Sequence, residues 1–430
     1  MSSATRGFEA LPIALHRTSL LPIEAECYTN AIMKKRKNRG PLEGIKVLDL
    51  SKYGPSRYCS MMLADLGAEV IVVEMPRTAG QTLDVVSDDV GSLYIGHNRN
   101  KKCIVLNLKK EEGKEIFYRL AEKMDVVIEA NRPGVLKRRG MDYATVKKLN
   151  PRLVYCSITG YGQDGPYAQR TGHEINFAAV SGIMGLTGSK NGPPVYLQSP
   201  SIADLLGGVT HAVIAITSAL FAREKNGKGQ YIDVSITDGT IFYHWIDGQS
   251  YLLNGNLPER PESSTGSDMA CMNTYKARDD KYFTVGCAEP WFWVKLCQLV
   301  GREDFVSHQY DDIDKQKEMY QALSEAFSAR DRDEWVKLLD EADIGVGPVY
   351  NFEEIFSDSH FKHRKVLAEV EHPKLGKIKL LNTPFKFSET PAGVRAGPPL
   401  WGEHTREVLS NILGYSESRI HHLLQEGVVE

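Results

Sequence analysis

The sequence predicts an α/β fold with a doubly wound parallel sheet, followed by a smaller α+β domain. Three observations support this prediction. From residue 41 onward, short apolar runs alternate with helical patterns; residues 250–272 are rich in loop-forming residues; and a compact, mostly helical segment follows them. A chain of 430 residues is long enough for two domains with separate cores, or for one large domain with an insertion.

The large domain opens with a βαβ pattern. Ile45–Leu50 is predicted to be a strand, Ser56–Leu66 a helix, and Glu69–Glu74 a second strand that ends in an acid. Such a unit gives parallel strands joined by a right-handed crossover. Ligands of doubly wound folds bind at the carboxyl ends of the strands. The next predicted elements are a strand at 103–108, a helix at 110–123, and strands at 125–130 and 153–159.

Gly160, Gly162 and Gly165 fit the G-x-G-x-x-G pattern, but they do not indicate a dinucleotide site. A dinucleotide fingerprint requires a helix directly after the glycines, and here Pro166 and a polar loop follow. The glycines instead suggest close approach of the backbone to something in the adjoining cleft.

The stretch from Gly172 to Ala222 holds the best candidate site. Apolar residues at helical spacing predict a helix from Asp204 to Ala222, with Asp204 as its N-cap over unpaired backbone N–H groups. His173 precedes another apolar-periodic run, 175–183. Two ionisable side chains would then stand at helix starts. The alternative, in which Asp204 only caps a helix and His173 only belongs to a turn, remains open.

The predicted domain organisation follows these patterns. The smaller domain holds a strand at 282–285 and helices at 291–299, 315–326 and 331–340, and a further helix is predicted at 403–425. The divisions are an N-terminal arm (1–40), the large domain (41–245), a linker (246–272), the small domain (273–372), and a linker with C-terminal helices that return to the large domain (373–430).

Composition narrows the function classes. The net charge is −3, and we expect neither nucleic-acid nor membrane binding, because no uncharged run of about eighteen apolar residues is evident. The seven cysteines are scattered without metal-type spacing, so they predict reduced thiols in a cytoplasmic protein and no metal site. The first forty residues end in a basic run, which does not fit a secretory signal, and Met33 is an alternative start.

Several segments, in the right order, carry a family resemblance. They are 41–50 (Pro-Leu-Glu-Gly-Ile-Lys-Val-Leu-Asp-Leu), 98–109, 131–135, 158–167 and 227–234. With these the chain resembles the class III CoA-transferases and α-methylacyl-CoA racemases (the CaiB/BaiF family). The resemblance implies a Rossmann-like large domain, a small domain, and two ring-shaped subunits interlocked as a homodimer. It also implies an acyl-CoA substrate, with no cofactor beyond the coenzyme A moiety.

Two chemistries occur in that family. Its transferases use an aspartate, matching Asp204, as a nucleophile that forms a mixed anhydride. Its racemases place a histidine and that aspartate on opposite faces of the acyl α-carbon. The segment Gly172-His-Glu-Ile-Asn-Phe is similar to the racemase version, and so is Cys287-Ala-Glu-Pro-Trp-Phe. The racemase resemblance assigns Glu289 to a hydrogen bond with the catalytic aspartate.

The racemase chemistry fits these residue types. A neutral imidazole facing a carboxylic acid can invert the carbon in one direction, and an imidazolium facing a carboxylate can invert it in the other. Glu174 would orient the His173 imidazole, Glu289 would raise the pKa of Asp204, and backbone N–H groups at the start of the Asp204 helix would stabilise the enolate.

The sequence around Asp204 is also compatible with other functions. Gln198-Ser-Pro-Ser-Ile-Ala-Asp-Leu is as similar to transferases as to racemases, so a CoA-transferase stays open as the alternative. A third class is a non-catalytic CoA-thioester binding protein, or an NAD-linked enzyme that uses Gly160–Gly165.

For coenzyme A the resemblance indicates Arg138, and basic residues that suit phosphates are available at Arg99, Lys101 and Lys102. The family's arginine after the second-strand acid is Met75 here, and Arg77 is its expected replacement. Tyr161 is expected to line the acyl pocket.

Overall fold

The computed structural model describes residues 40–52, 54–77 and 91–430, so the predictions for the N-terminal arm and Met33 lie outside it. Its main sheet has six parallel strands in the order β3-β2-β1-β4-β5-β6. The order reverses between β1 and β4, as in a doubly wound fold. The strands are β1 (Lys46–Asp49), β2 (Glu69–Glu74), β3 (Lys101–Val105), β4 (Val126–Glu129), β5 (Val154–Thr159) and β6 (Tyr231–Ser235).

Helices cover both faces of this sheet, which is why its strands are nearly continuous apolar runs. Along β1, Val47 belongs to the core on one face and Leu48 to the core on the other. One core receives α2 (Gly54–Asp65), α7 (Glu174–Val180), η3 (Ala203–Thr210), α8 (His211–Asn226) and α9 (Ile236–Phe242). The other receives α4 (Glu111–Ala121), α5 (Val135–Arg138), α6 (Tyr143–Val146), η5 (Val408–Ile412) and α17 (Glu417–Gln425).

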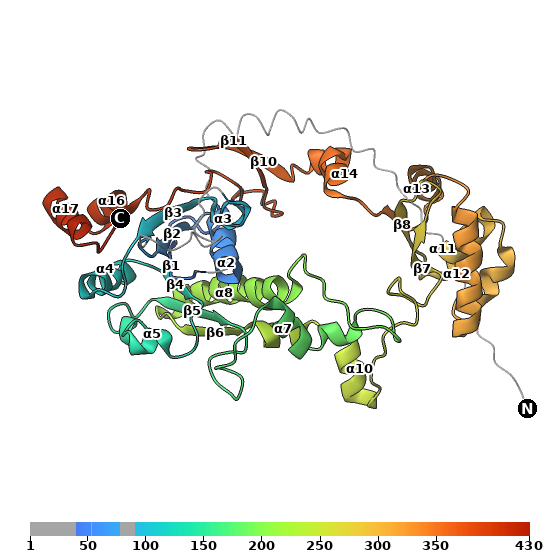
Figure 1. Cartoon of the computed structure of the whole chain (residues 1–430), viewed down its shortest axis with the longest axis horizontal. Helices are drawn as coiled ribbons and strands as arrows, with labels where there is room; N and C mark the ends of the chain where they lie inside the picture. Colours follow the sequence, from blue (N-terminus) through green and yellow to red (C-terminus); the bar gives the residue numbers. More distant parts are fainter. Residues whose placement is uncertain (1–39, 53, 78–90) are drawn as a thin grey trace, which may run out of the picture.

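A second group of elements has its own hydrophobic core and lies on the right of Figure 1. Its antiparallel sheet has the order β7-β8-β9. The elements are β7 (Met272–Lys276), β8 (Tyr282–Gly286), α11 (Pro290–Leu299), η4 (Glu303–His308), α12 (Ile313–Phe327), α13 (Arg332–Glu341) and β9 (Val346–Pro348).

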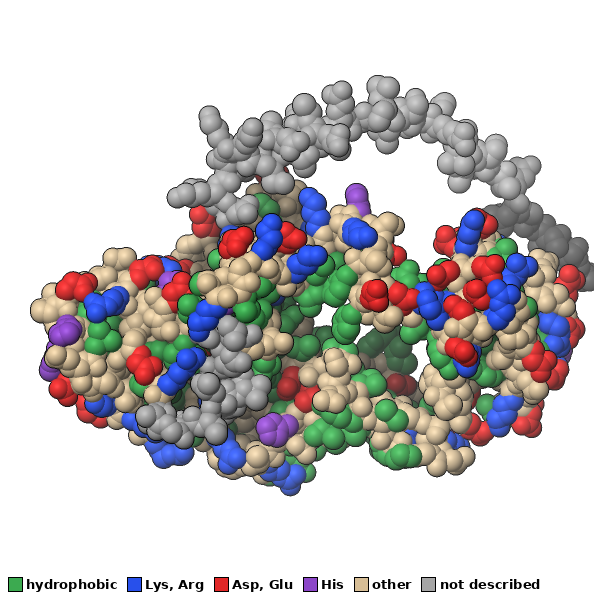
Figure 2. All heavy atoms as spheres, turned by 45° about the horizontal axis from the view of Figure 1, so that its top comes forward, with side chains coloured by type: hydrophobic (Ala, Val, Ile, Leu, Met, Phe, Trp, Pro, Cys, Tyr) green, Lys and Arg blue, Asp and Glu red, His purple; other side chains and the backbone are tan. Residues whose placement is uncertain are grey.

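The chain crosses between the two bodies twice (Figure 1). It leaves the main sheet through α10 (Asp247–Asn254) and returns through α14 (Phe352–Ser357) and α15 (Ser359–His363). Figure 2 shows the hollow that separates the bodies. The hairpin of β10 (Leu367–His372) and β11 (Gly376–Leu381) spans residue 372, so a domain boundary there would divide a two-stranded sheet. The remaining described helices are α3 (Ser92–Asn98), η2 (Ile183–Leu186) and α16 (Thr405–Glu407).

The continuous helix Ala203–Asn226 corrects one expectation. By length and composition alone it could cross a membrane, with a mean hydropathy of 1.8, so the expected absence of a long uncharged apolar run is wrong here. Its apolar residues have a packing role, because Ala212, Ile216 and Ala219 are buried in the core beneath the sheet.

Candidate active site

A cavity of about 540 Å³ opens at the carboxyl ends of β4 and β5, beside the start of α2. This is the position at which doubly wound folds bind their ligands. Four of the predicted catalytic and binding residues line it: Tyr161, His173, Glu174 and Asp204. The structure therefore brings the predicted imidazole and carboxylate to one cavity.

His173 is the N-cap of α7, as predicted. Its backbone is extended, with φ −128° and ψ 176°, and its N–H donates to Asn176 Oδ1 at 3.0 Å. This hydrogen bond fixes the helix start from which the exposed His173 side chain projects at the cavity.

Asp204 is not the N-cap that the sequence predicted. The N-cap is Ile202, so Asp204 lies in the first turn of the helix. Residues Ala203–Thr210 form a π-helix, η3, before the regular helix α8 begins. The spacing of apolar residues in the sequence could not distinguish this π-helical segment from a regular α-helix. Such turns occur frequently at functional sites.

Glu174 binds the start of η3 instead of orienting the imidazole. Its Oε1 accepts from the Ala203 N–H at 3.0 Å and its Oε2 from the Asp204 N–H at 2.6 Å. The assigned role of Glu174 is therefore corrected. The same two bonds occupy backbone donors that we expected to face an enolate oxygen.

The Asp204 carboxyl is strongly perturbed. Burial, and secondarily the negative charge of Glu174, raise its pKa to about 7. Its Oδ1 is buried and accepts no hydrogen bond from any described residue. We expected Glu289 to raise the pKa of Asp204. Burial and Glu174 raise it instead, within a single chain.

Glu289 lies in the second body, apart from the cavity. It is the N-cap of α11 on the right of Figure 1, and it does not line the cavity. One chain alone does not bring Glu289 to Asp204.

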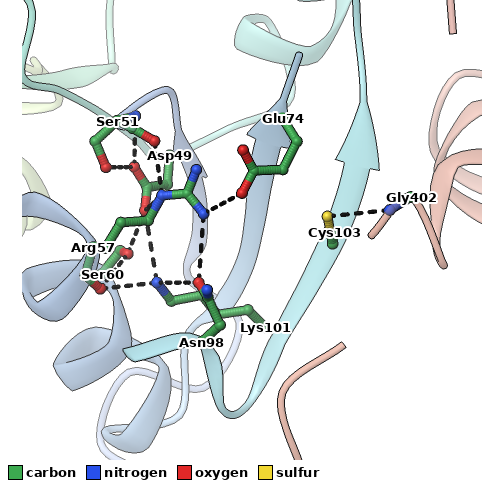
Figure 3. A network of polar contacts seen from close by, with 9 residues as sticks. All are labelled: Asp49, Ser51, Arg57, Ser60, Glu74, Asn98, Lys101, Cys103 and Gly402. Atoms are coloured by element: carbon green, nitrogen blue, oxygen red, sulfur yellow. Dashed lines mark hydrogen bonds and ion pairs between the residues drawn. The ribbon is translucent and has the colours of Figure 1, made fainter. Parts of the chain in front are cut away.

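Three of the predicted coenzyme A contacts are engaged in internal ion pairs. Arg99 is buried and forks onto Asp65, with Nη2 2.6 Å from Oδ2. Lys101 is also buried, and its Nζ donates to the Arg57 carbonyl at 2.8 Å within the network of Figure 3. Lys102 pairs with Glu69 at 2.8 Å and Glu407 at 2.9 Å. These cations hold helices and strands together, so the arrangement does not leave them available to phosphates.

The other predicted contacts have different surroundings. Arg138 is exposed at the end of α5, and Arg77 lies over the Trp401 ring at 4.6 Å. Tyr161 lines the cavity, with its ring edge-on to Phe177 at 5.3 Å.

Sequence reasoning missed three residues near this site. Arg132 and Arg170 both line the cavity. The pKa of Tyr196 is raised by desolvation and by the nearby charges of Glu174 and Asp204. The position of Arg170, three residues before His173, was a usable signal, whereas the contacts of Tyr196 depend on how the loop before η3 folds back.

Known proteins resemble the chain over most of its length. The profile of CoA-transferase family III matches residues 42–405. Human succinyl-CoA:glutarate CoA-transferase is 33% identical, with 91% of each chain covered. Human alpha-methylacyl-CoA racemase is 32% identical, with 90% of this chain and 97% of that protein covered. The crystal structure of a CAIB/BAIF family protein from Brucella suis superimposes with a TM-score of 0.77 at 30% identity, covering 87% of this chain and all of that one.

Proposed function

Because the chain belongs to CoA-transferase family III, we propose that it acts on acyl-CoA thioesters and, more narrowly, that it is a 2-methylacyl-CoA racemase or epimerase. The observation that carries the narrower proposal is the shared cavity of His173 and Asp204. A transferase needs only the aspartate, whereas inversion of a carbon needs a base and an acid.

The chemistry is two proton transfers. One group removes the α-proton, the electron pair of the C–H bond moves into the thioester as an enolate, and the opposite group returns a proton to the other face. A pKa of about 7 suits Asp204 to this exchange, because both of its protonation states are populated near neutral pH. The same pKa makes Asp204 a poorer nucleophile, since part of the population carries a proton.

The test is exchange of the α-proton of a chiral 2-methylacyl-CoA in D₂O without an acceptor acid. We expect deuterium incorporation by the native chain and a loss of about 10²- to 10⁴-fold in His173→Ala, as for removal of a general acid–base. His422→Ala, at an exposed histidine on α17, is the matched control. Native chain that incorporates no deuterium from either enantiomer would contradict the proposal for this substrate class.

The alternative is a CoA-transferase, which the similarity to succinyl-CoA:glutarate CoA-transferase favours. In that reaction the Asp204 carboxylate attacks the thioester carbonyl, the C–S bond breaks, and a mixed anhydride forms as coenzyme A leaves. Hydroxylamine would trap the anhydride at Asp204, and transfer between two carboxylates would survive His173→Ala. These results, without α-proton exchange, would establish the alternative.

We further propose a homodimer in which Glu289 of the partner subunit completes each cavity. A large apolar surface supports this, because Phe242, Trp245 and Leu252 are 72%, 73% and 76% exposed around α9 and α10. Monomers rarely expose so many large apolar side chains together. A cytoplasmic location is also proposed, and the six cysteines among the described residues, all unpaired and buried, agree with a reducing compartment.

A further inference from the structure

Arg170 is held at the rim of the cavity by a series of aromatic rings. Its guanidinium carbon lies 3.4 Å from the centre of the Tyr167 ring. Tyr167 meets Tyr161 edge-on at 5.9 Å, and Tyr161 meets Phe177, which is buried in the core. Stacking of this kind occupies the flat face of the guanidinium and leaves the N–H groups at its edge free to donate.

Two cations, Arg132 and Arg170, line the cavity, and neither is in an ion pair with an acid in the part of the chain that the structure describes. Among the described residues Arg170 has no acidic partner, and Arg132 beside it donates from Nη2 to Thr171 Oγ1 at 2.7 Å. Neither cavity acid forms an ion pair with these cations among the described residues: the Glu174 carboxylate accepts from two backbone N–H groups instead, and the raised pKa of Asp204 keeps that carboxyl partly protonated. An anionic ligand group therefore fits this rim.

The position of Arg170 indicates which part of the ligand it meets. Arg170 is three positions before His173, so their Cα atoms are at most about 11 Å apart. The phosphates of coenzyme A lie a full pantetheine arm away from the reacting carbon, whereas the end of a short acyl chain lies close to it. We propose that Arg170 binds a carboxylate at the far end of the acyl chain, so that the substrates are 2-methyl-branched dicarboxylyl-CoA thioesters. This inference rests on the proposed function for its acyl-CoA ligand.

The test compares binding of three ligands by calorimetry: coenzyme A, 2-methylpentanoyl-CoA and 2-methylglutaryl-CoA. The two thioesters have equal chain length and differ in the terminal carboxylate. In Arg170→Gln we expect the Kd for 2-methylglutaryl-CoA to rise about 10- to 100-fold, with the other two unchanged. Arg170→Lys keeps the positive charge but lacks the two parallel N–H donors of a guanidinium. Its increase in Kd for 2-methylglutaryl-CoA should therefore be intermediate. Arg364→Gln, at an exposed arginine after α15, is the control.

The outcomes separate the sources of the anion. An equal loss for all three ligands would assign Arg170 to a coenzyme A phosphate and overturn the inference, and so would unchanged binding of all three. The native chain must itself prefer 2-methylglutaryl-CoA to 2-methylpentanoyl-CoA, which keeps the inference testable if a variant does not fold. Deuterium exchange in the same samples reports separately on the racemase proposal: carboxylate-selective binding without exchange would refute that proposal and leave the role of Arg170 standing.

Discussion

At the scale of single residues, the site is built around a carboxyl group, that of Asp204, whose pKa is raised to about 7. Glu174 is nearly buried, and both of its oxygens accept backbone N–H groups at the start of η3. This arrangement places its negative charge beside Asp204 and contributes to the raised pKa of that residue. The pair thus supplies a proton-exchanging group without any contribution from the second body.

The raised pKa of Asp204 predicts a pH-dependent stability. The folded chain keeps the Asp204 proton up to about pH 7, whereas an unfolded aspartate loses it near pH 4. Between these values the folded chain binds more protons, so ionisation of Asp204 lowers the free energy of unfolding as the pH rises. Relative to the native chain, Asp204→Asn should therefore gain stability between about pH 4 and 7, by up to ~4 kcal/mol.

Urea unfolding at a series of pH values measures this difference. Asp314→Asn, at an exposed aspartate on α12, controls for the loss of one carboxylate. If the difference in free energy of unfolding between the native chain and Asp204→Asn stays constant over this pH interval, the pKa of Asp204 is that of an ordinary aspartate, near 4.

At the scale of elements, the close packing of η3 on α9 positions Asp204. A Cβ on Gly207 would lie 2.2 Å from Thr240 Oγ1 and 2.3 Å from the Ile236 carbonyl oxygen, and one on Gly239 would lie 2.0 Å from the Gly207 oxygen. Only glycine permits this approach of two backbones.

Gly207→Ala should therefore separate η3 from α9. We expect a loss of about 1–3 kcal/mol in the free energy of unfolding, as for overpacking, together with lower activity because Asp204 lies on the displaced helix. Gly96→Ala, inside α3 with no atom within 4 Å of the added Cβ, is the control and should be neutral or stabilising. Thermal unfolding and deuterium exchange on both variants measure the two effects, and equal behaviour of the two would contradict this account.

The sequence predicted elements where burial leaves a clear pattern. The inner strands β1, β2, β4 and β5 were predictable because both of their faces are buried. The edge strand β6 was not predicted as a strand, because exposed Tyr231 and Asp233 interrupt its apolar pattern, and the charged residues of β10 and β11 concealed that hairpin.

The same limit applies to the site. His173 and Asp204 belong to local motifs, so sequence reasoning found them. The partners of Glu174 and Arg99 lie about 30 residues away in the chain and depend on the packing of separate elements. That is why Glu174 and Arg99 were given other roles.

At the scale of the whole molecule, the exposed apolar surface around α9 and α10 predicts self-association. Trp245→Glu combined with Leu252→Glu would place two charges in the proposed interface, and burying an unpaired charge is strongly unfavourable. We expect the dimer Kd to rise more than a hundredfold, or about 3 kcal/mol. Light scattering after size-exclusion chromatography measures it.

Leu149→Glu, at a partly exposed leucine beside α6, controls for an added charge. A native chain that is monomeric at high concentration would contradict the dimer proposal. A double variant that stays dimeric would place the interface elsewhere.

The return of the chain to its first body has a consequence for biosynthesis. Val408, Leu423 and Val429 belong to the same core as β1 and α4, and Val429 bridges to Leu106 beyond β3. A ribosome that has made only the first half of the polypeptide has therefore released a sheet with one face covered only in part, by α4, α5 and α6. The rest of this face is covered only after the last residues emerge from the ribosome. Apolar residues of the nascent chain therefore stay exposed to aggregation until translation ends.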